Sequence, residues 1–166
     1  MAIKDPKELF VMLLSDVRQS AERTGKILQE LSQAAELPDI KEALEARAFV
    51  SNKMLNTIDE AFKLIGEKPV TLSGRLQDVF VEDFRRELGE IQSPVARHLY
   101  ILHKANQVVH LRIGEFVALV AAADMTGHFG VGVLLESCLG DYLSFVERTR
   151  RLIRHVAEAK VAARGA

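Results

Sequence analysis

The feature that most constrains the fold of this chain is a helical repeat of apolar residues sustained over four long segments. In each segment apolar side chains recur every three or four residues, which is the spacing of one face of an α-helix. Only four prolines and ten glycines interrupt the 166 residues. The pattern predicts an all-α protein. The first segment carries the series Leu9, Phe10, Leu13, Val17, Ala21, Leu28 and Leu31.

The breaks between the segments place the ends of the helices. Asp5 is a good N-cap residue, and Pro6 is well tolerated at the first helical position. Gly66 is suited to ending a helix, because glycine readily adopts the left-handed conformation found there. The expected long helices run from Pro6 to a break at Leu37-Pro38-Asp39, from Ile40 to Gly66, from Ser93-Pro94 to about Met125, and from about Phe129 to about Ala162.

The connections between these helices differ in length. The first and second helices, and the third and fourth, are joined by tight turns, whereas residues 67–93 separate the second from the third and hold a short helix at about 75–90. Such an asymmetry is typical of ferritin-like bundles. We therefore expect a single domain, residues 1–166, folded as a ferritin-like four-helix bundle with one long crossover that contains a short extra helix.

Composition excludes several classes of protein. A formal net charge of -1 indicates neither a nucleic-acid nor an anionic-membrane partner. The single cysteine, Cys138, excludes an internal disulfide framework and fits a reducing compartment. The sequence MAIKDPKELF lacks the features of a secretory signal, and we find no apolar run long enough to span a membrane. The expectation is a cytoplasmic protein.

Five stretches together resemble the YciF-like family of ferritin-like bacterial stress proteins. They are ELFVMLLSDVRQSAE, IKEALEARAF, DEAFKLIGEKP, ANQVVHLRIGEFVALVAAADMTGH and LLESCLGDYLSF, and the resemblance covers nearly the whole chain. It implies core-facing carboxylates and a His or Gln arranged like a di-iron site. Such sites need several carboxylates because oxygen ligands must neutralise two multiply charged ions, and imidazole completes the coordination.

At the positions that the resemblance assigns to metal ligands, this chain carries other residues. An arginine among them would repel a bound dication, and none of the substitutes supplies a carboxylate. We therefore expect a metal-free protein without a cofactor. The substituted positions are Ala21 in the first long helix, Val50 and Met54 in the second, Val109 and Arg112 in the third, and Tyr142 in the fourth.

An enzymatic alternative stays open. Glu22 adjoins Ala21 and Asp141 adjoins Tyr142, so a shift of one residue in the alignment would restore a carboxylate. One residue corresponds to about 100° of rotation around the helix, which turns Glu22 off the apolar stripe and places Asp141 toward the edge of its stripe. This alternative is a ferritin-like oxidoreductase that keeps iron or manganese at an altered site formed by Glu22, Asp141, Glu115 and His110.

Helical geometry places Arg112 inside the bundle with Glu115 three residues further along, within reach of an ion pair. Asp16 and Asp141 are candidates to extend this polar cluster. The interpretation that we favour is an internal ion pair filling the space of a lost metal site. A second alternative is a carrier of a small ligand or anion that uses the cavity around Arg112. Arg47 is either another internal partner for a carboxylate or a residue whose head reaches water.

The remaining polar residues do not predict a metal-binding or catalytic site. His103, Gln107 and His110 share the side of the third helix away from Arg112, and we interpret its histidines, including His98, as surface or dimer-interface residues. His128 is expected in the turn before the fourth helix and His155 in the basic tail. Cys138 is expected to be a buried, inert thiol, because no His or Asp spacing supports a catalytic dyad.

The C-terminal segment ERTRRLIRHVAEAK combines basic and apolar residues. Its cations, among them Arg148 and Arg154, form either a solvated helix face, which we favour, or a docking surface for an acidic partner. We expect Leu152, Ile153 and Val156 to be exposed at the end of the bundle and therefore to support a homodimer. The sequence thus predicts a non-catalytic homodimer with a structural or partner-binding role.

Overall fold

The computed structural model describes the backbone of residues 3–165 and the side chains of residues 3–159. It is all-helical over this range, as predicted. The last helix continues three residues beyond its expected end at Ala162, and the other bounds agree closely with the sequence pattern. The helices are α1 (Pro6–Ala34), α2 (Pro38–Ile65), α3 (Arg75–Glu90), α4 (Pro94–Met125) and α5 (Phe129–Gly165).

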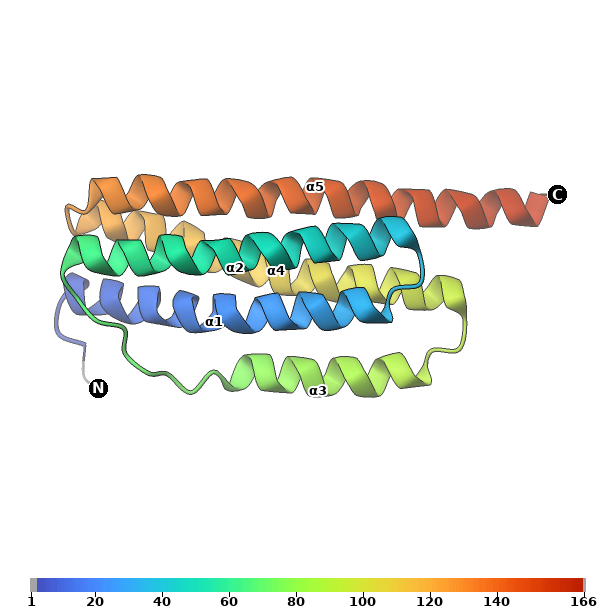
Figure 1. Ribbon diagram of the computed structural model, residues 1–166, viewed down its shortest axis with the longest axis horizontal. Coiled ribbons are helices and arrows are strands. Elements are labelled where there is room, and N and C mark those ends of the chain that lie inside the picture. Colours follow the sequence, from blue (N-terminus) through green and yellow to red (C-terminus); the bar gives the residue numbers. More distant parts are fainter. Residues whose placement is uncertain (1–2, 166) are drawn as a thin grey trace.

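The four long helices form two antiparallel hairpins, α1–α2 and α4–α5, that pack side by side (Figure 1). In the bundle α1 also packs against α4, and α2 against α5. The crossover carries the chain from the end of α2 back along the whole bundle to the start of α4, so that these two helices run in the same direction (Figure 1). This is the predicted ferritin-like four-helix bundle with a short extra helix in its crossover.

A continuous apolar core runs along the axis of the bundle. Each fully buried Leu, Ile or Phe contributes about 1.5–3 kcal/mol of transfer free energy to folding. The apolar stripes predicted from the sequence therefore account for most of the cohesion between the helices. The side chains of this core with an exposed fraction of 0 or 1% include Phe10, Leu14, Leu28, Leu31, Ile40, Leu44, Ile58, Ile101, Leu102, Phe116, Leu119 and Leu135.

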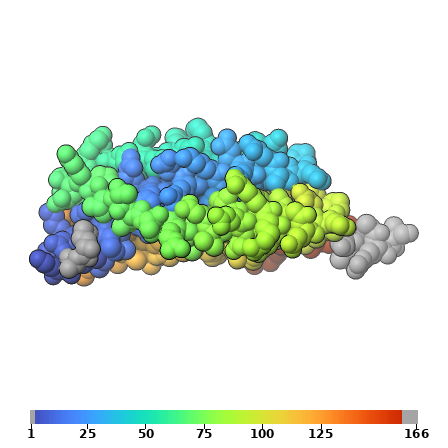
Figure 2. Space-filling view, turned by 90° about the horizontal axis from the view of Figure 1, so that it is seen from below, coloured from blue at the N-terminus to red at the C-terminus, as the bar shows by residue number. Residues whose placement is uncertain are grey.

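Three side chains of α1 hold the crossover against the bundle. The Ser15 hydroxyl accepts a hydrogen bond from the Val70 N–H at 3.0 Å. The Gln19 amide accepts from the Leu72 N–H at 3.1 Å and donates to the Leu72 carbonyl at 2.8 Å. Arg23 donates to the Gly74 carbonyl. Because these three residues are four apart, one face of α1 fixes an extended loop, and Figure 2 shows the loop and α3 lying along α1.

Gly74 is the one position of the crossover where the backbone requires glycine. Its φ of +61° lies in the left-handed region. A Cβ atom built there would stand 1.9 Å from Nη1 of Arg23. A residue with a side chain would therefore disturb both the turn and the hydrogen bond that anchors α3.

The apolar residues of the C-terminal segment are not exposed as the sequence analysis expects. Val156 is only 6% exposed and belongs to the main core, and Leu152 and Ile153 pack against that core. The first turns of α4 and the second half of α5 are part of the same bundle, which supplies this cover. The argument for a homodimer from these three residues is therefore wrong.

One described helix is long and apolar enough to cross a membrane by length and composition alone. It is the segment Phe129–Ala159 of α5, with a mean hydropathy of 1.4 over its most apolar window, of which 33% is buried. The core helix of a water-soluble bundle meets the same criterion, because its inward face must be apolar. In α5 that face contributes Val131, Leu135 and Tyr142 to the core.

Candidate functional site

The positions assigned to metal ligands by resemblance meet near the middle of the bundle, one or two from each long helix. Five of the six are buried. Arg112 and Tyr142 are the two largest fully buried side chains of the described chain. The bundle centre is therefore occupied by a guanidinium and a phenol, surrounded by apolar atoms. The exposed fractions are 0% for Ala21, 2% for Met54 and 0% for Val109, Arg112 and Tyr142.

Val50 does not share this central position. It is only partly buried and packs at the edge of the core, whereas the next residue, Ser51, is completely buried. The inward face of α2 is formed by Arg47, Ser51 and Met54, whose spacing of four and three residues follows the helical repeat. The expected inward position of Val50 is thus wrong by one residue, because the register of α2 is set by Met54 and Arg47.

Arg112 and Glu115 form the ion pair that their spacing predicts. Nη2 of Arg112 lies 2.7 Å from Oε1 of Glu115, and the Glu115 side chain is 20% exposed. The pKa of Glu115 is raised to about 7, because burial outweighs the opposing effect of the Arg112 guanidinium, and the charge of Asp16 contributes to the rise. The single carboxylate that faces this arginine is therefore only partly ionised at neutral pH.

Arg47 is a second internal arginine, and its surroundings match neither of the alternatives set by the sequence. Its exposed fraction is 3%, so its head does not reach water. It lies against an aromatic ring instead of a carboxylate, with its Cζ atom 3.9 Å from the ring centroid of Tyr142. Its Nη2 donates to the sulfur of Met54 at 3.4 Å. Burial lowers the pKa of Arg47, which shows how weakly these neighbours compensate its charge.

Asp16 and Asp141 do not join the cluster as hydrogen-bond partners. Asp141 is exposed and Asp16 is partly buried, and in the described chain neither carboxylate lies within ion-pair distance of Arg112 or Arg47. Both act only through their charge, Asp16 on Glu115 and Asp141 on Arg47. The expected cluster of four residues therefore reduces to Arg112 with Glu115, and the structure adds Arg47 and Tyr142 to it.

Several polar atoms at the bundle centre have no hydrogen-bond partner among the described residues. Buried polar groups in folded proteins are nearly always hydrogen-bonded, to protein, water or an ion. Ser51 and Thr24, which the sequence analysis did not single out, lie one helical turn from Arg47 and Ala21 on the same inward faces. The unpartnered atoms are Nε and Nη1 of Arg47, Nε and Nη1 of Arg112, the hydroxyls of Thr24, Ser51 and Tyr142, and Oε2 of Glu115.

The residues of the altered metal site are not brought together. Glu22 is exposed and accepts a hydrogen bond from Lys26 at 2.9 Å. His110 is exposed on the outer face of α4, where its Nδ1 lies 2.8 Å from the Asn106 carbonyl. Between residues 3 and 159, no three His, Cys, Asp or Glu side chains converge closely enough to hold a metal ion. The residues at the bundle centre therefore do not fit a di-iron or di-manganese centre.

The other histidines and the cysteine take structural positions. His98 is 7% exposed, which corrects its expected place on the surface, and its Nε2 lies 3.8 Å from a carboxylate oxygen of Glu36. The ring of His128, in the turn before α5, stacks on Phe10 at 5.7 Å. Burial raises the pKa of the Cys138 thiol to about 11, so that the reactive thiolate is scarce at neutral pH.

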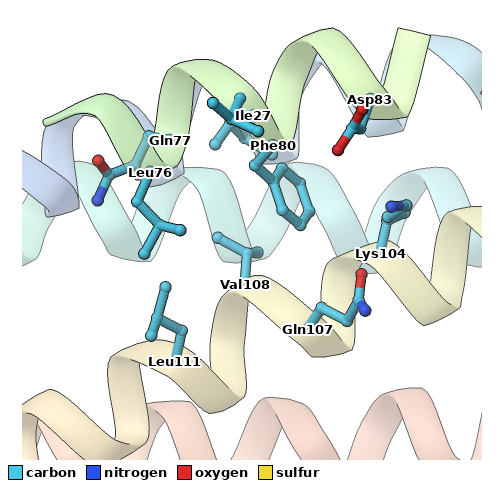
Figure 3. A pocket seen from close by; sticks show the side chains of 10 residues that line it. Ile27, Leu76, Gln77, Phe80, Asp83, Lys104, Gln107, Val108 and Leu111 are labelled. Atoms are coloured by element: carbon cyan, nitrogen blue, oxygen red, sulfur yellow. The ribbon is translucent and has the colours of Figure 1, made fainter. Parts of the chain in front are cut away.

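A groove lies outside the core, between α3 and α4. Its volume is about 330 Å³, its walls are mostly apolar, and Phe80, Val108 and Leu111 project into it (Figure 3). Its lysine, Lys104, is already paired, with Nζ 2.9 Å from a carboxylate oxygen of Glu87 and 5.3 Å from the ring centroid of Tyr100. The groove is the seam that remains where α3 only partly covers the bundle.

Comparison with known proteins agrees with this architecture. A family model described as a domain of unknown function, DUF892, matches residues 5–164. A comparison with curated proteins gives no match. The chain is similar in structure to the Escherichia coli stress protein YciF, with a TM-score of 0.88 and 18% identity over 94% of this chain and 99% of that one.

Two further solved structures share the fold. YcfI from Rhodopseudomonas palustris, for which a structural role has been suggested, has a TM-score of 0.84 and 22% identity over 89% of this chain and 94% of its own. A protein from Xanthomonas campestris has a TM-score of 0.72 and 17% identity over 94% of this chain and 99% of its own. At these identities the structural similarity shows the fold alone, whereas the family model covers nearly the whole chain. The chain therefore belongs to the DUF892 family and is a YciF-like member of it, folded as a ferritin-like helical bundle.

Proposed function

We propose that this protein is a non-catalytic, metal-free member of the YciF-like stress family, with a structural or partner-binding role in the cytoplasm. The observation that carries the proposal is the composition of the bundle centre. Arg112 and Arg47 bring two positive charges to the place where a ferritin-like protein would hold two metal ions. Ala21, Met54 and Val109 complete the lining with groups that cannot replace carboxylate ligands.

The physical basis of the proposal is electrostatic. Two divalent ions carry four positive charges, and the centre already contains two guanidinium groups against the one carboxylate of Glu115. In an interior of low polarity, like charges repel each other more strongly than they do in water. Metal binding at this centre would therefore add to an existing excess of positive charge, which is unfavourable.

Metal analysis tests this proposal. The purified chain, produced in medium supplemented with iron or manganese, is expected to contain far less than one ion per chain after brief treatment with a chelator. A variant with restored ligands, Ala21→Glu/Arg112→Glu, is the control that shows whether bound metal survives the purification. Iron or manganese that stays bound to the original chain at about one ion per molecule, and is lost in Glu115→Ala, would establish the oxidoreductase alternative.

The proposed partner is a second copy of the chain, and the proposed surface differs from the one suggested by the sequence. Large apolar side chains are exposed on the outer faces of the second half of α4 and the first half of α5. A surface of this kind is unfavourable in water unless another molecule covers it. Its residues are Val117, Met125, Phe129, Val133 and Leu143, which are 50–68% exposed.

A further inference from the structure

The bundle centre has more hydrogen-bond donors than acceptors. Arg47 and Arg112 each leave an Nε and an Nη1 group without a partner, and both side chains are more than nine-tenths buried. The hydroxyls of Ser51, Thr24 and Tyr142 can donate or accept. Oε2 of Glu115 is the one unpartnered atom of the described centre that only accepts when ionised. The groups of the protein alone therefore cannot satisfy one another.

The centre has an excess of positive charge as well as an excess of hydrogen-bond donors. The centre contains two buried guanidinium groups but one partly exposed carboxylate, that of Glu115, whose Oε1 lies 2.7 Å from Nη2 of Arg112. Asp16 and Asp141 are the next carboxylates, and they lie at the edge and the surface of the bundle. An uncompensated charge in a protein interior is costly, so an excess of buried positive charge favours a bound anion.

Tyr142 connects the two arginines. Its ring centroid lies 3.9 Å from Cζ of Arg47 and 5.4 Å from the ring centroid of Phe116, whose plane is tilted by 51°. Arg112 is close enough for its charge to act on the same phenol group. Donors from α2, α4 and α5 are thus collected around one side chain that is 0% exposed.

A groove on the surface leads towards this centre. It lies between α2 and α5, has a volume of about 220 Å³, and is lined by Ala43, Ala46, Arg47, Val50, Asp141, Ser144, Phe145 and Arg148. Arg47 belongs both to the wall of this groove and to the core. This side chain is therefore where the groove on the surface adjoins the buried centre.

We propose that the centre of the bundle binds one small monovalent anion, of the size of a halide or nitrate ion, between the guanidinium groups of Arg47 and Arg112 and the hydroxyl of Tyr142. Such an ion only accepts hydrogen bonds, so it complements unpartnered donors without adding new ones. A water molecule would add two donors of its own to a centre that already has too many. Guanidinium groups are well suited to hold anions because they are planar, permanently charged and weakly hydrated.

The size of the anion follows from its surroundings. Ala21, Val109 and Phe116 are completely buried next to the polar groups, so that the centre has no room for an extended organic ligand. The site would hold the ion as a structural component and would give the bundle a stability that depends on the anion. This inference is independent of the proposed dimer and requires only that the centre contain no metal.

Thermal unfolding at constant ionic strength tests the proposal. Replacement of sodium gluconate, whose anion is too large for the centre, by sodium chloride, bromide or nitrate is expected to raise the Tm of the full chain by about 3–5 °C. Tyr142→Phe keeps the ring that carries Arg47 and removes one donor, so the same shift should need about tenfold more anion. The matched control Arg86→Met removes an exposed arginine and should retain the full shift. Equal shifts in the original chain and Tyr142→Phe, or no shift in either, would overturn the proposal.

A crystal grown in sodium bromide gives a second measurement that needs no variant. Bromide scatters anomalously, and we expect one anomalous peak within hydrogen-bond distance of Arg47 and Arg112. A bundle centre that contains only water, or no density at all, would overturn the proposal. Bromide confined to exposed arginines such as Arg86 would do the same, since it would show adventitious binding alone.

Discussion

The ionisation of the Glu115 side chain differs strongly from that of a free amino acid. Its carboxylate pairs with Arg112, yet burial has the larger effect on its ionisation and raises its pKa from 4.5 to about 7. A buried ion pair often gains less from attraction than it loses in solvation. The pair therefore compensates the charge of the buried Arg112 but adds little net stability to the fold.

This shift predicts how stability depends on pH. The folded chain holds the proton of Glu115 more tightly than the unfolded chain, so this group favours folding most below pH 4.5 and progressively less as the pH rises through about 7. At about 1.4 kcal/mol per pH unit, reduced for partial exposure, the free energy of unfolding should fall by about 1–2 kcal/mol between pH 5 and pH 8. Urea unfolding at both values measures the change. Glu115→Gln, which cannot titrate, should show a flatter dependence, and an equally steep one would contradict the assignment.

The neighbours of Glu115 give a second prediction at this scale. Arg112 lowers the pKa of Glu115 and Asp16 raises it. Arg112→Met should therefore move the pKa above 7, and Asp16→Asn should move it below. Titration of the Glu115 carboxyl carbon by NMR follows both changes. An unchanged pKa in both variants would show that burial alone, without the neighbouring charges, governs this group.

At the scale of the elements, the crossover is the part of the bundle held mainly by polar contacts. Helix α3 buries Phe84 and Gln77, while Leu76 and Val79 remain 59% and 50% exposed. It stays in place largely because Ser15, Gln19 and Arg23 of α1 bond the loop before it. Segments with few buried apolar contacts open at a lower free energy than the core around them.

Gln19→Ala tests this description. The substitution removes both hydrogen bonds to Leu72 and should lower the free energy of local opening of the crossover by about 1–3 kcal/mol. Hydrogen exchange should then accelerate by about tenfold or more in residues 70–90 and change little in α2 and α5. Glu22→Ala on the same helix removes only an exposed pair with Lys26 and is the control. Equal acceleration throughout the chain would show that the crossover does not open separately.

At the scale of the whole molecule, the exposed apolar side chains of α4 and α5 are the main feature that one bundle leaves unexplained. Phe129 and Val133 are 66% and 68% exposed, close to the turn that joins the two helices. A few isolated apolar residues on a surface are ordinary, but five large ones on one hairpin suggest an interface. The core of the bundle does not need them, because the opposite faces of both helices already supply it.

The dimer that we propose is tested by Val133→Glu. A carboxylate in the middle of an apolar interface would have to be desolvated, so dissociation should increase by tenfold or more while the helical content stays unchanged. Light scattering coupled to gel filtration measures the mass, and circular dichroism measures the helix. Leu64→Glu changes a side chain of α2 with a similar exposure of 58% and should leave the mass unaffected. A monomeric original chain, or a Val133→Glu variant that remains a dimer, would contradict the proposal.

The helices, their ends and the crossover could all be predicted from the amino-acid sequence. These are local properties: the apolar repeat of α1, the Pro6 and Gly66 boundaries and the Ser93-Pro94 start depend on residues only a few positions apart. The spacing of Arg112 and Glu115 on one helix was sufficient to predict their ion pair. For the same reason Tyr142 could be assigned to the inward face of α5, since periodicity fixes which residues of a helix face the core.

The contacts that those inward residues make could not be predicted, because they depend on how the helices pack. The contact of Arg47 with Tyr142 joins α2 to α5, and the bonds from Gln19 to Leu72 join α1 to the crossover, across separations that no local pattern records. The burial of Val156 and His98 and the exposure of Asp141 also depend on how far neighbouring helices extend and how they rotate. A helical repeat specifies a face, but the partner of that face is set by packing among all the helices, because burial is a property of the assembled bundle.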